Sequence, residues 1–79
     1  MVDPELIQQG QQRRKQIIQF VGAFWRNNGM APSLEEVAVG VGVTRTAVRL
    51  HLTQMTDSGQ VLMTPGRMRS LRLPPTDSA

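Results

Sequence analysis

The segment from Ser33 to Gly59 constrains the fold more than any other, because it carries the start and stop signals of two helices. Ser33, with Glu36 three residues later, matches the capping box that begins a helix. Thr44 is a good N-cap for a second helix, and Gly59 is expected to end it. Gly42 stands where the chain must turn sharply, with a positive φ that glycine tolerates. The segment therefore predicts two helices joined by a tight turn.

The small and apolar residues of this segment have the spacing of a helix-turn-helix motif. Ala38 is small enough for the second helix to cross the first closely, and Val48 anchors the second helix to the core. Further apolar residues follow Val48 at helical spacing, Leu52 and Met55 among them, on the inner face of the helix expected over residues 44–58. This arrangement leaves one face of that helix outward.

The outer face of this helix is cationic and has no carboxylate from Thr44 to Thr56. Arginine is the commonest reader of guanine, and threonine or leucine side chains meet the thymine methyl group. In a helix-turn-helix motif these positions enter the major groove of DNA. The residues expected to contact DNA from the motif are Ser33, Thr44, Arg45, Thr46, Arg49, Leu50 and Thr53. A helical hairpin with a merely solvated outer face is the alternative.

A third helix is predicted over residues 13–28, where apolar residues recur with the period of an α-helix. Trp25 is expected in the core of the protein, and Phe20 is expected to be half exposed. Residues 1–12 are expected to form an N-terminal arm that is frayed or loosely docked. Within that arm, Asp3 as a cap and Pro4 as the first helical residue favour a short helix.

Residues 60–74 predict a β-hairpin, with strands at 61–63 and 70–73. Apolar and polar residues alternate in the second strand, so one of its faces is expected to be buried. Between the strands, Thr64-Pro65-Gly66-Arg67 has proline and glycine at the central positions of a type II turn. A hairpin that follows the second helix of a helix-turn-helix is a wing.

Two arginines, Arg67 and Arg69, are expected to project from the hairpin loop. Residues 64–70 are therefore expected to contact the DNA backbone or the minor groove. A purely structural hairpin with solvated arginines is the alternative. Residues 74–79, which start with two prolines, are expected to form a polar tail.

The charge of the chain is concentrated in its central part. Between Gln12 and Leu73 there are nine basic and three acidic residues, a balance of +6 against +3 for the whole chain. Such a balance suggests a polyanionic partner. Eight of the nine basic residues are arginine, which suits bidentate contacts to phosphate or guanine.

Several classes of function are not expected from this composition. The 79 residues fit one small domain, and without cysteine they have no disulfide and no thiolate metal site. Scattered acids and a single histidine, His51, make no metal-ligand cluster and no set of catalytic groups, so neither a cofactor, nor a small-molecule ligand, nor an enzyme is expected. His51 is expected to be packed or half buried. No apolar run reaches the ~18 residues of a membrane span.

Several short runs of the sequence follow one family pattern. They are Asn28-Gly29-Met30-Ala31-Pro32-Ser33, Glu36-Val37-Ala38, Gly42, His51-Leu52, Met55, Gly59 and Leu71-Arg72-Leu73. With them, the chain resembles the N-terminal DNA-binding domain of LexA-type repressors over most of its length. The resemblance implies a mainly α, three-helix winged helix-turn-helix with a small β-hairpin over residues 13–73. It also implies transcriptional repression, double-stranded DNA bound as a homodimer, and a cytoplasmic location in a bacterial, phage or plasmid context.

The chain departs from this family in three respects. The turn before the second helix of the motif is one residue shorter, and the outer-face residues Thr44, Arg45, Thr46 and Arg49 differ from the usual set. The family's operator sequence therefore does not carry over. The chain also leaves no residues for the family's self-cleaving peptidase domain, and its only lysine, Lys15, makes a Ser–Lys dyad implausible. A winged-helix module that binds another protein within a larger complex is the alternative function, and exposed Leu50 and Phe20 would favour it.

Overall fold

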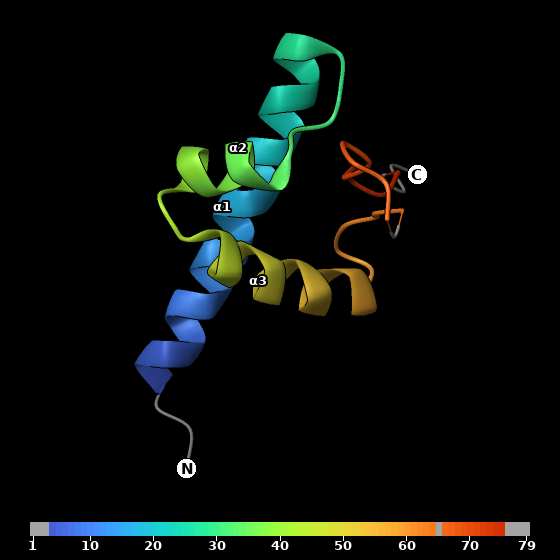
Figure 1. Cartoon of the computed structure of the whole chain (residues 1–79). Helices are drawn as coiled ribbons and strands as arrows, with labels where there is room; N and C mark the ends of the chain where they lie inside the picture. The colour runs from blue at the N-terminus through green and yellow to red at the C-terminus, as the bar shows by residue number, and fades with distance from the viewer. Residues whose placement is uncertain (1–3, 65, 76–79) are drawn as a thin grey trace.

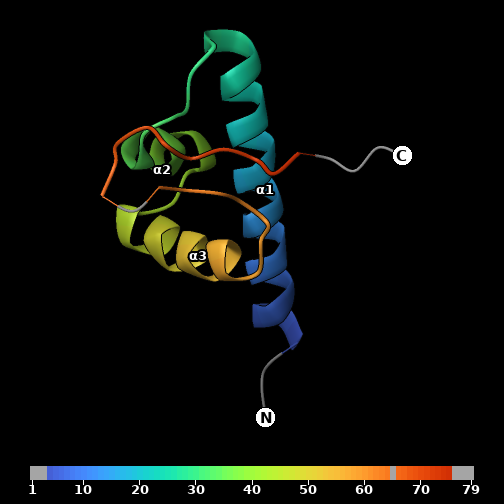
Figure 2. The same cartoon turned by 90° about the vertical axis from the view of Figure 1, so that its right-hand side faces the viewer.

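The computed structural model describes residues 4–64 and 66–75, with side chains from Gln8 onward. It contains three helices: α1 (Pro4–Asn28), α2 (Leu34–Val41) and α3 (Arg45–Asp57). Both short helices pack against the long α1 (Figure 1). The chain after α3 then runs out past α2 and returns across α1 (Figure 2). This last part, residues 60–73, is called the closing segment below.

The capping signals predicted the two short helices correctly. The Ser33 hydroxyl accepts a hydrogen bond from the Glu36 amide at 3.1 Å, and the Glu36 carboxylate accepts one from the Ser33 amide at 2.8 Å. The Thr44 hydroxyl accepts a hydrogen bond from the Ala47 amide at 3.1 Å, which caps α3. Gly42 has a φ of 81°, as the turn requires. The described structure is thus mainly helical and compatible with a helix-turn-helix.

One apolar core joins all three helices to the closing segment. Val48 and its neighbours at helical spacing on α3 are buried, as predicted, and Val61 and Leu71 cover them from the closing segment. Its fully or nearly fully buried members are Ile17, Val21, Val37, Ala38, Val48, Leu52, Met55, Val61 and Leu71. Each large member contributes about 1.5–3 kcal/mol by leaving water.

The first helix begins much earlier than residue 13. It starts at Pro4, so most of the segment expected to form a loose arm is the first part of α1. Glutamine is a good helix former, and one glycine inside a helix costs only about 1 kcal/mol, so Gly10 does not interrupt it. Just after this part of α1, Arg14 Nη1 donates to Gln54 Oε1 of α3 at 3.1 Å. Asp3, the expected cap, lies outside the described residues.

The two aromatic residues considered above differ in how far the core covers them. Trp25 was expected in the core but is 38% exposed, and its Nε1 donates to the backbone oxygen of Leu71 at 3.0 Å. Phe20 is partly buried, and its ring packs against the core and covers Gly40 of α2. A Cβ atom at position 40 would lie 2.0 Å from that ring, so the contact requires glycine. Periodicity placed both residues on α1 correctly, but the partners across the core decided their burial.

The expected hairpin is reduced to one antiparallel bridge, and the described residues contain no strand. The bridge consists of Leu62 N donating to Arg72 O at 2.8 Å and Arg72 N donating to Leu62 O at 2.9 Å. At the next hydrogen-bonded position of such a ladder, Thr64 would face Ser70. There the Ser70 hydroxyl replaces the backbone, since it accepts from Thr64 N at 3.0 Å and lies 3.1 Å from Thr64 O. The ladder therefore stops after one pair.

The turn within the closing segment has the expected form where it is described. Arg67 N donates to Thr64 O at 3.2 Å, and Gly66 has a φ of 73°, as the third residue of a type II turn requires. Pro65, the other predicted turn residue, lies outside the described residues, as do residues 76–79 of the expected tail.

Candidate nucleic-acid interface

The outward face of α3 has the exposure that was expected. Six predicted contact residues are exposed, and they are Thr44, Arg45, Thr46, Arg49, Leu50 and Thr53. The side chains of Arg45 and Arg49 form no hydrogen bond or ion pair with any described residue. Their guanidinium groups therefore keep their full donor capacity for a ligand.

Some of the hydroxyl groups on this face are engaged inside the protein. The Thr44 hydroxyl caps α3, and the Thr53 hydroxyl donates to the backbone oxygen of Arg49 at 2.9 Å. The Ser33 hydroxyl, predicted as a DNA contact, accepts the capping bond of α2. A hydroxyl used in this way has less capacity left for a base, which leaves the two arginines as the main polar groups of the face.

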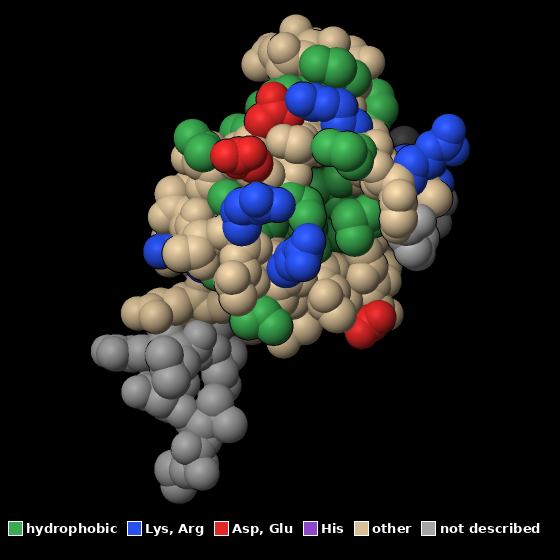
Figure 3. Space-filling view, in the orientation of Figure 1, with side chains coloured by type: hydrophobic (Ala, Val, Ile, Leu, Met, Phe, Trp, Pro, Cys, Tyr) green, Lys and Arg blue, Asp and Glu red, His purple; other side chains and the backbone are tan. Residues whose placement is uncertain are grey.

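A groove of about 650 Å³ brings several of the predicted residues together. Its walls are the N-terminus of α2, one side of α3 and the closing segment, and four arginines and Glu35 border its apolar floor (Figure 3). The predicted residues that line it are Ser33, Arg45, Arg49, Thr53, Arg67 and Arg69. Thr44, Thr46 and Leu50 lie on α3 outside this groove.

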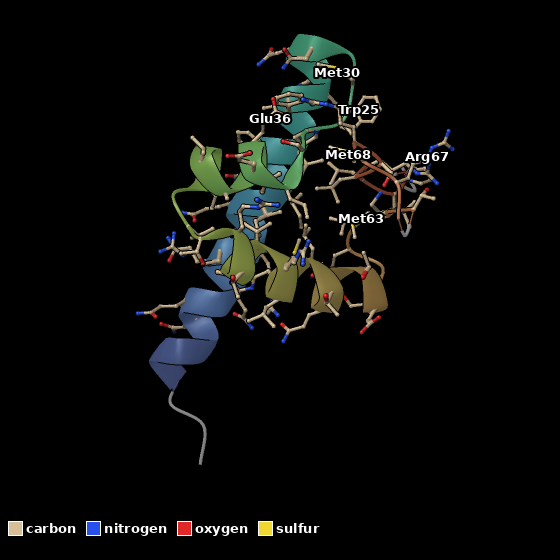
Figure 4. The ribbon with its side chains drawn as sticks, in the orientation of Figure 1. Trp25, Met30, Glu36, Met63, Arg67 and Met68 are labelled. Atoms are coloured by element: carbon tan, nitrogen blue, oxygen red, sulfur yellow. The ribbon has the colours of Figure 1, made fainter. Side chains whose placement is uncertain are left out.

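The groove also contains residues that the sequence did not single out for this site. Met63 is 39% exposed and Met68 is 86% exposed, and Leu71 adds a buried apolar wall. Both methionine side chains come from the closing segment, and in Figure 4 they lie on the side of it that faces α2 and α3. Met63 was expected in the first strand of the hairpin and Met68 falls between the two expected strands, but nothing in the local pattern indicated that they would line a groove with α3.

The two arginines of the closing segment differ, although both were expected to project from it. Arg67 is exposed and lies on the outer side of the segment (Figure 4). Arg69 is folded back onto α2, where its Nη1 donates to Glu36 Oε1 at 2.7 Å and to the backbone oxygen of Ala31 at 3.1 Å. The expectation is therefore correct for Arg67 and wrong for Arg69.

The surroundings of two titratable groups, Glu36 and His51, shift their pKa values. The hydrogen bond from the Ser33 amide, helped by Arg69, lowers the pKa of the Glu36 carboxyl although partial burial opposes this shift. Burial lowers the pKa of His51, and the charges of Arg14 and Arg13 lower it further. His51 is half buried, as expected. Neither group lies on the outer face of α3.

The described residues offer neither a metal site nor a membrane-spanning helix. Within 4–64 and 66–75, no group of three or more histidine, cysteine, aspartate or glutamate side chains is placed to hold a metal ion. None of α1, α2 and α3 is both long and apolar enough to cross a membrane.

Comparison with known proteins agrees with this geometry. Residues 8–70 match the LexA DNA binding domain, a match that begins inside α1 and ends in the closing segment. The LexA repressor 2 of Pseudomonas putida is 31% identical over 62 residues, which are 77% of this chain and 31% of that repressor. The chain thus spans less than a third of the length of this relative. The matched residues include the capped α2, the turn at Gly42 and the cationic α3, and the chain belongs to the LexA-type DNA-binding domain family.

Proposed function

We propose that this chain is the DNA-binding part of a transcriptional repressor and binds double-stranded DNA sequence-specifically. The observation that carries the proposal is the pair Arg45 and Arg49, which are exposed on α3 at the edge of the groove and free of partners among the described residues. Membership of the LexA-type family supports it independently. A cationic helix face without carboxylates is suited to the negative potential of a DNA groove.

In this proposal α3 lies in the major groove. Arg45 and Arg49 are four residues apart, so they point to the same side of the helix and reach neighbouring base pairs. Leu50 and Thr46 are placed beside them to meet thymine methyl groups. Bidentate contact between arginine and guanine is the chemistry that would give this surface its specificity.

The test is selection of preferred sites from random duplex DNA, followed by affinity measurements on variants. Arg49→Ala should lower affinity for the selected site by about 1–3 kcal/mol and relax the preference at one or two positions. Arg26→Ala, which removes an exposed arginine in the last turn of α1, is the matched control. Unchanged affinity and preference in Arg49→Ala would refute the assignment of α3.

The closing segment acts as the wing in this proposal, and Arg67 binds a DNA phosphate from it. Arg67 is exposed beside a turn that contains glycine, which is a poor platform for precise base contacts. Arg67→Ala should therefore weaken binding to all sequences by similar factors. Because one arginine–phosphate pair is removed, the slope of log affinity against log salt should become shallower by about 0.9. An unchanged slope would mean that Arg67 does not touch the backbone.

Binding as a homodimer on DNA completes the proposal. A single module of this kind covers only about 600–1,000 Å² and reads few base pairs, which is too little to find one genomic site. Two half-sites about one helical turn apart would place both α3 helices on the same side of the duplex. Met68, which is 86% exposed, is a candidate contact between protomers, whereas the partly buried Phe20 is a weaker one. Sedimentation of the free chain and stoichiometry on a selected site test this; one protomer per high-affinity site would refute it.

A protein-binding module is the second candidate function. Leu50 favours it, because this large apolar side chain is 63% exposed. Phe20 does not favour it, since its ring packs over Gly40. Enrichment of one sequence family in the duplex selection would decide for DNA, and failure to enrich any sequence would decide against it.

A further inference from the structure

Arg69 joins two parts of the molecule that are far apart in sequence. Its Nη1 has two hydrogen atoms, and they are donated to Glu36 Oε1 at 2.7 Å and to Ala31 O at 3.1 Å. The same Glu36 oxygen accepts the capping bond from Ser33 N at 2.8 Å. One carboxylate oxygen therefore both begins α2 and fastens the closing segment to it.

The backbone at Arg69 is shaped for this contact. Arg69 has a φ of 53°, and it is the one non-glycine residue with a positive φ among those described. An L-residue adopts this left-handed conformation only when its surroundings compensate the cost. With this backbone conformation, the Arg69 side chain reaches Glu36 of α2 while the hydroxyl of the next residue, Ser70, accepts a hydrogen bond from Thr64 N. The unusual backbone and the ion pair thus belong to one arrangement.

The tip of the closing segment, residues 66–69, has few other contacts that hold it in place. Its single backbone bridge, between Leu62 and Arg72, lies at the base, and the bond from Trp25 to Leu71 lies there as well. The Ser70 contacts tie the segment only to itself. Arg69 is therefore the side chain whose bonds connect the tip to α2, and through α2 to α3.

The charged neighbours of the two arginines also indicate different roles for Arg69 and Arg67. The Arg69 guanidinium faces a carboxylate whose pKa is lowered, so the pair is neutral in sum at neutral pH. A DNA phosphate would have to compete with Glu36 for it. Arg67 has no such competitor among the described residues, and it is two residues away on the exposed side.

We propose that Arg69 is a positioning residue for DNA binding: its ion pair with Glu36 holds the tip of the closing segment against α2 and so fixes the position of Arg67 at the rim of the groove. This rests on the proposed function, and it replaces the expectation that Arg69 contacts phosphate. An exposed ion pair contributes little free energy. We therefore expect Arg69 to act by holding the tip in place before DNA binds, and not by adding a large binding energy.

The experiment compares Arg69→Gln, Glu36→Gln and the double variant with the wild-type chain, using fluorescence anisotropy on the selected duplex. Glu36→Gln keeps an acceptor for Ser33 N, so the capping box survives while the charge is removed. Glu35→Gln is the matched control for the loss of a carboxylate near DNA, because Glu35 is the exposed neighbour of Glu36 and lines the same groove. Circular dichroism should report the same helix content in all of these proteins.

Each single variant should bind DNA about two- to fivefold more weakly, which is the range of exposed ion pairs. The double variant should be no weaker than the singles, the salt slope should stay as in wild type, and Glu35→Gln should bind at least as tightly as wild type. The proposal is overturned if Arg69→Gln makes the slope shallower by about 0.9 while Glu36→Gln binds as well as wild type or better. That result would mean that Arg69 binds a phosphate directly.

Limited trypsin cleavage after Arg67 tests the positioning without DNA. Arg69→Gln and Glu36→Gln should both increase the cleavage rate by a similar factor, whereas Glu35→Gln should not. Unchanged cleavage in both variants would overturn the proposal. If wild type binds no duplex at all, the proposed function fails, and the cleavage rates still decide whether Glu36 and Arg69 hold the tip.

Discussion

The α2–α3 pair and the closing segment lie side by side around one groove, yet they are built in different ways. Each of these helices begins at a capping residue whose hydroxyl accepts a hydrogen bond from a backbone amide three residues later, as at Ser33 and Thr44. The closing segment has one backbone bridge and otherwise depends on side chains, among them Trp25 of α1 and its own Arg69.

This difference shows that the two sides of one groove are held in place by different kinds of contact. The helical pair is held by buried apolar surface. The closing segment is anchored by Val61 and Leu71, but its tip depends on polar contacts at the surface. We expect such a tip to open with a lower free energy than the helices, because few buried contacts hold it.

The largest effect is expected from Leu52→Ala. Leu52 is 1% exposed and lies between the two regions, so its truncation leaves a cavity and should cost about 2–5 kcal/mol. Both regions should then unfold together in a urea titration followed by circular dichroism. Leu50→Ala, on the same helix but 63% exposed, is the control and should change stability by no more than about 0.5 kcal/mol. Equal destabilisation in the two variants would contradict this account of the core.

Gly40→Ala should test the close contact between α2 and α1. The added Cβ would lie 2.0 Å from the Phe20 ring, and such overpacking costs about 1–3 kcal/mol. Gly10→Ala is the matched control, since a Cβ there would lie 3.9 Å from Arg14 and should stabilise α1 by about 1 kcal/mol. Thermal denaturation of both variants measures the difference. If Gly40→Ala is as stabilising as Gly10→Ala, the Phe20 ring moves aside freely.

Trp25→Phe should affect the closing segment alone. It removes the donor that binds Leu71 O, a hydrogen bond of the kind that contributes about 0.5–1.5 kcal/mol. Amide exchange at Leu62 and Arg72 should become faster, while exchange within α3 stays as in wild type. Met30→Ala, which truncates an exposed side chain nearby, should leave both rates unchanged. Faster exchange in α3 as well would show that the two regions are not separable.

The smallest effect is expected from acid, at the residue where the two regions meet. The pKa of Glu36 is lowered in the folded protein from its ordinary value of 4.5, so its stabilising contribution is fully present above that pH. The contribution should disappear as the pH falls from 4.5 through the lowered pKa. Wild type and Glu36→Gln should therefore differ in stability at pH 7 and converge in strong acid. A constant difference down to low pH would mean that the carboxylate charge is not involved.

The sequence could predict much of the helical frame and part of the site. Capping residues and apolar periodicity placed α2 and α3 and the inner face of α3, because each of these signals acts over a few residues. The same reasoning started α1 too late, since a polar, glycine-containing run suggests a loose arm although its glutamines favour a helix. It also placed Trp25 in the core, because periodicity alone cannot show how far a neighbouring segment covers the ring.

What the sequence determined by itself is therefore what lies within one turn of helix: the caps, the turn at Gly42, the buried stripe and the cationic outer face of α3. The tertiary structure alone decided the form of the closing segment and the different environments of Arg67 and Arg69. Arg69 meets a partner 33 residues away, and Trp25 meets one 46 residues away. Contacts across such distances exist only after the core has formed, because the chain must first be brought together at a cost in entropy that no local pattern records.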